Sequence, residues 1–245
     1  MRSKRGEDTG MLEKLPDGYN AVVIGSTGEI GAAILERLRT DERCANAIGL
    51  SRGTDLAIDY KAPASLQDAA AKIKAELGEI HFLFIATGIL ASSDGASPEK
   101  AFSQLTPESL SEEFAINAAG PALALSAFMP LLPRNAPCIV ASLSARVGSI
   151  GDNGLGGWIS YRASKAALNQ IMHTAAIELG RKNDQAVCVS LHPGTIESEL
   201  SRPFARDRFT HTADECATNL LGVLSNLTPD QNGGFFDYAG EEIVW

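Results

Sequence analysis

Tyr161 and Lys165 are the residues of this chain best suited to acid–base chemistry. They lie four positions apart in the segment Tyr-Arg-Ala-Ser-Lys, and the alanines and leucines that follow predict a helix over residues 160–179. Side chains at this spacing share one face of a helix. An ammonium group beside a phenol favours the phenolate, so we expect the pKa of Tyr161 to fall below its usual value of about 10. Such a phenol can act as a general acid or base near neutral pH.

A glycine-rich turn near the N-terminus is typical of a nucleotide-binding site. It follows an apolar run at residues 19–24 that predicts a buried strand, and residues 32–38 after it predict a helix. Glycines let the backbone approach a pyrophosphate, and the helix N-terminus supplies amide donors and a positive dipole. The spacing is Gly-x-x-Gly-x-x-Gly rather than Gly-x-Gly-x-x-Gly, and a tight loop without a ligand is the alternative. The predicted cofactor contacts here are Gly25, Ser26, Thr27, Gly28, Glu29, Ile30 and Gly31.

Composition limits the classes of protein to which this chain can belong. The 245 residues are 44% hydrophobic and 21% charged, with a net charge of −9, which fits one large α/β domain and disfavours nucleic acid as a partner. The residues also lack a signal-peptide core and any His/Cys/Asp cluster with metal-ligand spacing, so we expect a cytoplasmic protein without a metal site. The widely spaced cysteines predict reduced thiols; they are Cys44, Cys138, Cys188 and Cys216.

An uncharged stretch at residues 114–133 is close in length to a membrane span. Polar and helix-bending residues interrupt it, and much of the rest is alanine. We therefore expect a helix buried between layers of protein and no membrane partner. The interrupting residues are Asn117, Gly120, Pro121, Ser126 and Pro130.

Apolar runs alternate with helical segments along most of the chain. This alternation predicts a single doubly wound, Rossmann-type α/β domain with a mostly parallel sheet and helices on both faces. Ligands of such sheets bind at the carboxyl ends of the strands. Residues 1–17 are polar and mixed in charge and are expected to form a flexible tail before a domain at residues 18–245. Further strands are expected at 47–51, 80–87, 137–142, 186–191 and 235–238, and further helices at 65–77 and from Pro107 through Asn117.

In their order along the chain, these motifs resemble the short-chain dehydrogenase/reductase family. The resemblance covers nearly the whole chain from Asn20 and rests on the glycine turn, Asn117-Ala-Ala-Gly120, a serine-bearing strand end, Tyr161 with Lys165, and Pro193-Gly194. Within the family, residues 143–150, residues 161–165 and the ending Phe-Phe-Asp at 235–237 look most like the branch of C-factor signalling proteins and sniffer-like carbonyl reductases.

The resemblance implies a role for each catalytic residue. Tyr161 would give a proton to a substrate carbonyl as hydride arrives from the nicotinamide, and Lys165 would lower its pKa and hold the nicotinamide ribose. Asn117 would anchor a water in the proton relay. The family's carbonyl-orienting serine is often the second of two, and that position here is Ala145. We choose Ser144, because it lies nearer the strand end than Ser142, and a turn serine is the alternative.

The end of the second strand predicts which cofactor is bound. NAD-preferring sites place an acidic residue about 20 residues past the glycines, whereas this chain has Ser51-Arg52, and an arginine can pair with a 2′-phosphate. We therefore expect NADP, and Asp55 leaves NAD open. By resemblance, Asp59 and Tyr60 contact the adenine. The other expected contacts are Ala86, Thr87 and Gly88, where the family's asparagines are missing and local rigidity is in doubt, and Pro193, Gly194, Ile196 and Ser198 near the nicotinamide.

The sequence thus predicts an NADP-dependent reductase of a small carbonyl compound. Residues 148–157 and about 199–212 are the expected substrate loops, the second as a lid or an ordinary surface loop. The family also implies a homodimer or homotetramer that packs through the Asn117 and Tyr161 helices. Two alternatives remain: a cofactor-binding signalling or sensor protein of the C-factor type, and an epimerase or dehydratase of the extended branch. About 50 residues after Pro193-Gly194 are few for the separate substrate domain of that branch.

Overall fold

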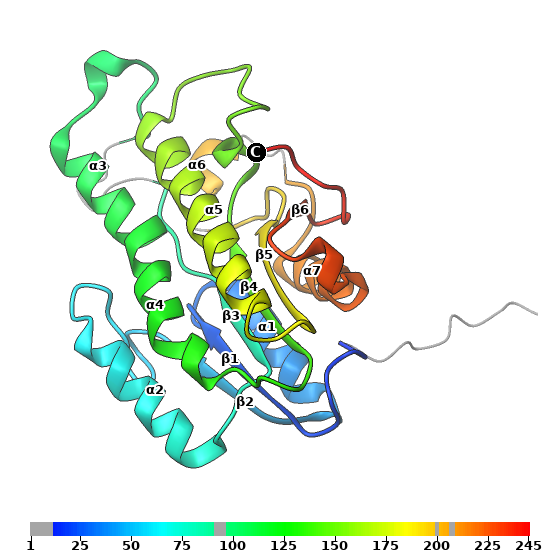
Figure 1. Cartoon of the computed structure of the whole chain (residues 1–245). Coiled ribbons are helices and arrows are strands. Elements are labelled where there is room, and N and C mark those ends of the chain that lie inside the picture. The colour runs from blue at the N-terminus through cyan, green and yellow to red at the C-terminus, as the bar shows by residue number, and fades with distance from the viewer. Residues whose placement is uncertain (1–11, 91–96, 199–200, 206–208) are drawn as a thin grey trace, which may run out of the picture.

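A six-stranded sheet forms the centre of the computed structural model, which describes residues 12–90, 97–198, 201–205 and 209–245. The strand order is β2-β1-β3-β4-β5-β6, and every neighbouring pair is parallel. Helices cover both faces (Figure 1). The strands are β1 (Tyr19–Ile24), β2 (Cys44–Leu50), β3 (Phe82–Ile85), β4 (Cys138–Leu143), β5 (Ala186–His192) and β6 (Phe235–Asp237). The helices are α1 (Glu29–Thr40), α2 (Ala64–Leu77), α3 (Pro107–Phe114), α4 (Gly120–Phe128), α5 (Ile159–Gly180), α6 (Arg202–Ala205) and α7 (Ala213–Asn226).

The doubly wound fold predicted from the sequence is confirmed, and the sheet is parallel throughout. Its central strands are apolar at nearly every position because both of their faces are covered. Val22 and Leu83 belong to the core on one face, whereas Val23 and Phe84 belong to the core on the other. The chain runs from β1 outward to β2 and then returns to β3 on the other side of β1. The carboxyl ends of β1 and β3 therefore flank the point where the winding reverses, which is where such sheets bind ligands.

Most of the expected elements are present with shifted ends. The second strand begins earlier, at Cys44, and the third is shorter, Phe82–Ile85, because the chain leaves the sheet at Ala86. The helix expected through Asn117 is made of α3 and α4 joined by a π-helical turn, Ala115–Ala119. Such turns place one extra residue in a helix and often occur at functional sites.

The packed part of the chain begins before residue 18, the predicted start of the domain. Leu12 and Leu15 are fully buried in the core. The guanidinium group of Arg43 donates to the backbone carbonyls of Leu12 and Leu15, and Lys14 donates to the carbonyl of Asn226 at 2.8 Å. Residues 12–17 thus pack as part of the domain rather than as a tail, because both leucines lie in its core. The remainder of the expected tail lies outside the described residues.

The continuous helical stretch Pro107–Leu131 is long and apolar enough to cross a membrane by length and composition. In the structure its most apolar window is 44% buried, and α4 lies between α2 and α5 (Figure 1). The core helix of a soluble protein passes the same test of length and composition. The helix packs against its neighbours, but less than half of this window is buried, so the expected burial between layers of protein is confirmed only in part. The absence of a membrane partner stays a prediction.

Candidate active site

Asn117 occupies the π-helical turn and is fully buried. Its side-chain oxygen accepts a hydrogen bond from the backbone N–H of Ile89 at 2.8 Å, and its Nδ2 donates to the carbonyl of Ile89 at 2.8 Å. The same Nδ2 donates to Ser164 Oγ at 3.0 Å. Asn117 therefore fixes the chain that follows β3 to helix α5. The expected role in anchoring a water stays a prediction.

Tyr161 and Lys165 lie on the inner face of α5, as the sequence predicts. Tyr161 is 8% exposed and Lys165 is 3% exposed. The ammonium nitrogen of Lys165 donates to the carbonyl of Leu143, at the end of β4, at 2.9 Å, and lies 5.9 Å from the centre of the Tyr161 ring. Helix α5 thus holds both groups at the carboxyl edge of the sheet.

Burial dominates the proton affinities of this pair. Burial lowers the pKa of Lys165 to about 8, although the nearby Glu113 acts in the opposite direction. Burial raises the pKa of Tyr161 above its usual value, and the charge of Glu113 raises it further. The expected lowering of the Tyr161 pKa by Lys165 is therefore wrong for the protein alone. The cost of placing a phenolate in an apolar site exceeds the attraction of an ammonium 5.9 Å from the ring.

Ser144, the expected carbonyl-orienting residue, is buried next to α5. Its hydroxyl donates to Asn169 Oδ1 at 2.6 Å. Asn169 follows Lys165 by one helical turn on the same face, and the sequence analysis did not identify it. Ser142 lies within the sheet, where its hydroxyl is 3.5 Å from the carbonyl of Ile85. Ser144 must release Asn169 before it can donate to a carbonyl group, and its role stays a prediction.

The glycine turn after β1 requires glycine at two of its three positions. Gly25 has φ +83°, and a Cβ there would lie 2.9 Å from the backbone of Ala86. A Cβ on Gly31 would lie 2.2 Å from the carbonyl oxygen of Gly25. Gly28 precedes the first residue of α1, whose N-terminus faces the turn. This cradle of backbone at a helix N-terminus fits the pyrophosphate of a dinucleotide.

Gly88 packs directly against Lys165 and Asn117. A Cβ at this position would lie 3.1 Å from the ammonium nitrogen of Lys165 and 3.3 Å from Asn117 Oδ1. A nicotinamide ribose held by Lys165 would need the room that a larger side chain would fill. The residues present therefore fit a nicotinamide dinucleotide that extends from the glycine turn to Tyr161.

Arg52 projects into solvent directly after β2. The turn that carries it is fixed by Ser51, whose N–H donates to Thr54 Oγ1 at 2.9 Å and whose hydroxyl accepts from the N–H of Gly53 at 3.2 Å. Within the described residues, Arg52 makes no ion pair with an acidic side chain. Its guanidinium group is therefore available to a ligand at this strand end.

The segment after β3 lacks the family's asparagines, which puts its rigidity in doubt. Tyr60 supplies a contact that holds this segment. Its hydroxyl lies 2.9 Å from Thr87 Oγ1, and burial raises its pKa to about 12. The ring rests against Gly120, where a Cβ would lie 2.0 Å from it. The neighbouring Asp59 accepts from the N–H of Lys61 at 2.9 Å. The chain after β3 is thus held by the Tyr60–Thr87 bond and by Asn117.

The turn after β5 is held by the segment that follows α6. Gly194 has φ +78°, and a Cβ there would lie 2.6 Å from Thr210 Oγ1. The ring nitrogen Nε2 of His211 lies 2.7 Å from the carbonyl oxygen of Pro193. Ser198 Oγ, an expected nicotinamide contact, lies 3.1 Å from Ser201 Oγ. Part of the expected lid, residues 199–200 and 206–208, lies outside the described residues.

An aromatic cluster borders Tyr161. Trp158 has the left-handed φ of 50°, and its ring centre lies 6.2 Å from that of Tyr161 and 6.0 Å from that of Phe204 in α6. Arg162 holds the preceding loop by donating to the carbonyl of Gly157 at 2.9 Å. The sequence analysis missed these contacts, although a bulky residue directly after two glycines was a usable signal.

A parallel sheet with a glycine cradle at its reversal point and a buried tyrosine–lysine pair at the same edge defines a dinucleotide-dependent oxidoreductase. The comparisons with known proteins name the family. A profile described as enoyl-(acyl carrier protein) reductase matches residues 30–223. The chain belongs to the short-chain dehydrogenase/reductase family, and it is an NAD(P)-dependent enzyme of that family.

Relatives of this chain include a signalling protein and a dehydrogenase. C-signal of Myxococcus xanthus is 37% identical over 136 residues, which are 56% of this chain and 78% of the relative. The 1-hydroxy-2-glutathionyl-2-methyl-3-butene dehydrogenase of a Rhodococcus species is 28% identical over 233 residues, which are 91% of this chain and 98% of the relative. The NADPH-bound carbonyl reductase from chicken fatty liver has the same fold, with a TM-score of 0.80 and 23% identity over 98% of this chain and 100% of that chain.

Proposed function

We propose that this protein uses NADPH to reduce the carbonyl group of an aldehyde, ketone or quinone to an alcohol. The observation that carries the proposal is the buried group of Tyr161, Lys165 and Asn117 at the carboxyl edge of the sheet, against which Gly88 packs. Similarity of fold to a carbonyl reductase bound to NADPH and to the carbonyl reductase Sniffer of D. melanogaster supports this substrate class.

In this proposal Tyr161 is the proton donor. When bound, a nicotinamide would supply a hydride to the carbonyl carbon, and Tyr161 would donate its phenolic proton to the carbonyl oxygen. Because burial raises the pKa of Tyr161, the phenol carries its proton at neutral pH. Lys165 stabilises the phenolate that remains, since its ammonium group lies on the same buried face of α5. Trp158 packs edge-on against the Tyr161 ring, and Phe204 packs against Trp158, so one side of the phenol borders an aromatic cluster.

The preference for NADPH rests on Arg52. This exposed side chain follows β2 where NAD-preferring sites carry an acidic residue, and within the described ranges no carboxylate pairs with it. A guanidinium group binds a phosphate bidentately and strongly. Asp55 is exposed in the same turn and is the residue that would favour NADH.

Oxidation of NADPH and NADH against a panel of aldehydes, ketones and quinones tests this function. We expect turnover with NADPH that Tyr161→Phe abolishes and that Arg52→Gln weakens more for NADPH than for NADH. Glu108→Gln, an exposed change far from the glycine turn, serves as the matched control. Binding of either cofactor by the wild type without turnover of any carbonyl would overturn the reductase proposal.

A signalling or sensor role is the second candidate function. Two observations favour it: the similarity to C-signal and the engagement of Ser144 with Asn169, next to an alanine where the family often has a second serine. In that case cofactor binding would change the protein's contacts rather than drive turnover. Saturable NADPH binding that is unchanged in Tyr161→Phe, with no turnover in either protein, is the result expected of a sensor.

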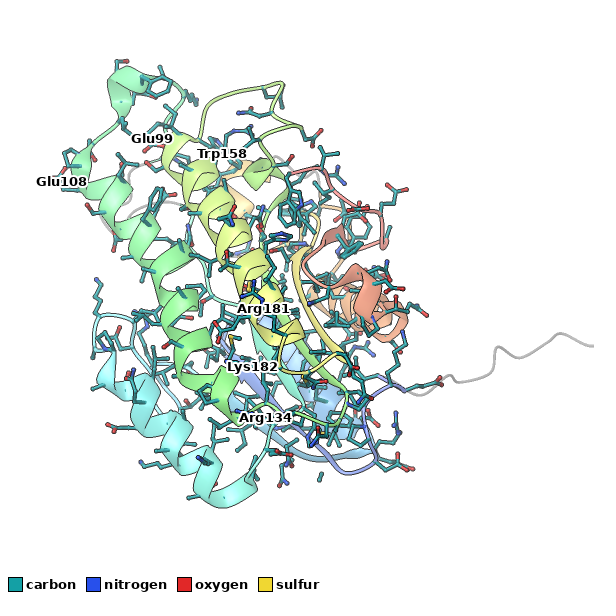
Figure 2. All side chains as sticks on the ribbon, viewed as in Figure 1. Glu99, Glu108, Arg134, Trp158, Arg181 and Lys182 are labelled. Atoms are coloured by element: carbon teal, nitrogen blue, oxygen red, sulfur yellow. The ribbon has the colours of Figure 1, made fainter. Side chains whose placement is uncertain are left out.

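We further propose that the protein is a cytoplasmic homo-oligomer that pairs through α4 and α5. A groove of about 570 Å³ between these helices is lined by apolar side chains such as Leu125 and Ile171. Arg134 and Lys182 lie at its end (Figure 2), where Lys182 pairs with Glu178 of α5 at 2.6 Å. The apolar lining is therefore the surface that a second copy would cover. Four unpaired cysteines, three of them buried, fit a reducing compartment. Sedimentation equilibrium of wild type and Ile171→Glu tests the pairing, and a monomeric wild type would refute it.

A further inference from the structure

Helix α3 and the π-helical turn carry a row of polar residues that faces α5. Ser109, Glu113 and Asn117 recur at intervals of four and so share a face of the helix. The two helices pack side by side (Figure 1). The first and last residues of the row are hydrogen-bonded: Ser109 donates to Glu99 Oε1 at 3.0 Å, and Asn117 donates to Ser164 Oγ at 3.0 Å. Glu113 lies between them.

Glu113 is the member of this row whose burial is unexplained. Its side chain is 2% exposed, and its Oε2 has no hydrogen-bond partner within the described residues. A buried carboxylate oxygen without a partner is costly, because the water it loses is not replaced. Leucine or glutamine would fill the same space at lower cost. A glutamate at this position therefore indicates a use for its charge.

The groups on which the charge of Glu113 acts are the catalytic pair. Glu113 opposes the lowering of the Lys165 pKa by burial and adds to the raised pKa of Tyr161. Its own pKa is raised to about 8 by burial first, then by the carboxylates of Glu99 and Glu112, while Lys165 lowers it. These are the titratable groups that face it from α5, from α3 and from the chain before α3. Glu113 and Lys165 therefore titrate in the same range and influence each other.

We propose that Glu113 is a positioning residue of the active site, whose buried carboxyl group keeps the proton on Lys165. As the pH rises, the carboxylate that forms at Glu113 attracts the ammonium charge across the α3–α5 interface. Lys165 then remains able to hold a ribose hydroxyl and to stabilise the phenolate of Tyr161. The catalytic meaning of this inference rests on the proposed carbonyl reduction, whereas the effect on Lys165 is a property of the folded protein alone.

A titration of Lys165 by NMR tests the proposal without a substrate. The whole protein is labelled with ¹³C at the lysine ε-carbons, and Lys165→Arg identifies the signal. We expect Glu113→Gln to lower the titration midpoint of Lys165 by about one pH unit, a tenfold weaker hold on the proton. Glu108→Gln is the control, because Glu108 is exposed on the outer side of α3. Glu99, in contrast, lies between α3 and α5 (Figure 2). An unchanged midpoint in folded Glu113→Gln overturns the proposal.

A second variant and a second measurement complete the test. Glu113→Asp keeps the charge at a shorter reach, so its midpoint should lie between those of the wild type and Glu113→Gln, and it replaces the latter if that variant does not fold. In Glu113→Gln, the fall of kcat/KM at alkaline pH should occur at a lower pH than in the wild type. This shift should equal the shift in the titration midpoint of Lys165. A shifted midpoint with an unmoved pH profile refutes a role in the reaction. A shifted midpoint in a protein that turns over no carbonyl refutes the reductase function and supports the action of Glu113 on Lys165.

Discussion

Glu99 and Glu113 are two buried carboxyl groups at the interface of α3 and α5, and their surroundings are opposite. Glu99 is 4% exposed, and its carboxylate accepts from the N–H of Ser160 at 3.2 Å, from the hydroxyl of Ser160 and from that of Ser109. Glu113 has an oxygen with no partner in the described part of the chain. Glu99 is therefore a carboxylate that binds the first turn of α5, whereas Glu113 is a carboxyl group whose charge forms only as the pH approaches its pKa of about 8.

The two carboxyl groups also differ in proton affinity. Burial pushes the pKa of Glu99 upward, but the hydrogen bonds from Ser160 and Ser109 outweigh it and hold the pKa below its usual value. Burial raises the pKa of Glu113 to about 8, and no described hydrogen bond opposes this. Hydrogen bonds thus lower the pKa of Glu99, whereas burial and the nearby carboxylates of Glu99 and Glu112 raise that of Glu113.

Removal of Glu99 should have the largest effect on stability. Glu99→Ala leaves the N–H and the hydroxyl of Ser160, at the start of α5, without their acceptor. The hydroxyl of Ser109 in α3 keeps the carbonyl of Thr106 as an acceptor at 3.1 Å. We expect the free energy of unfolding to fall by about 2 kcal/mol or more, because each of the two unpaired buried donors of Ser160 costs about 1 kcal/mol or more. Urea unfolding at pH 7 measures this change. If Glu113→Ala were equally damaging, the contrast between the two carboxyl groups would be lost.

Glu113→Gln should give a smaller effect that depends on pH. The pKa of a glutamate is near 4.5 in the unfolded chain and is about 8 at Glu113 in the folded protein. Below pH 4.5 both states hold the proton, and the charge has no effect on stability. Between these values the folded state alone holds the proton, so wild-type stability falls as the pH rises and reaches its full loss above pH 8.

The glutamine variant does not ionise and escapes this loss. We therefore expect Glu113→Gln to be more stable than the wild type at pH 9 by about 1 to 3 kcal/mol, the cost of an unpaired buried group, and to show little gain at pH 5. Urea unfolding at the two pH values gives the difference, with Glu108→Gln as control. A gain of equal size at both pH values would mean that packing, and not charge, separates the two side chains.

The two carboxyl groups also show which features of the protein can be predicted from its sequence. The sheet, the glycine turn and the face shared by Tyr161 and Lys165 were predictable, because strand and helix periods and helix spacing are local properties of the sequence. Glu99 and Glu113 were not, since the sequence alone does not show that residues 99 and 109 meet at the start of α5. Nor does it show that Glu99 accepts three hydrogen bonds, whereas Glu113 Oε2 has no donor within the described residues. The same reason explains why the pKa of Tyr161 was misjudged: spacing gives the position of Lys165, whereas burial comes from the whole fold.

The choice of serine is a further case of a local pattern with a non-local outcome. The end of β4 predicts that Ser142 and Ser144 point to the same side of the strand, and the sequence cannot say what lies there. In the structure Asn169 of α5 accepts the hydroxyl of Ser144, from 25 residues along the chain. The sequence of the strand alone therefore does not predict this hydrogen-bond partner of Ser144.

The smallest expected effect concerns the hydrogen bond between Asn117 and Ser164, at the Asn117 end of the polar row. Ser164 Oγ accepts from Asn117 Nδ2 at 3.0 Å and donates to the carbonyl of Tyr161 at 2.9 Å. Ser164→Ala removes one of the two acceptors of Nδ2, but the carbonyl of Ile89 remains bonded to it at 2.8 Å. We expect a loss of about 1 kcal/mol in the free energy of unfolding, the net worth of one hydrogen bond.

This loss should be the same at pH 5 and pH 9, because neither partner titrates. Urea unfolding at both pH values therefore distinguishes the hydrogen-bonded amide of Asn117 from the ionisable carboxyl group of Glu113. A pH-dependent loss in Ser164→Ala would mean that Asn117 transmits the charge of Glu113. The carboxyl group would then act on Lys165 through the hydrogen bonds of this row rather than directly across the helix interface.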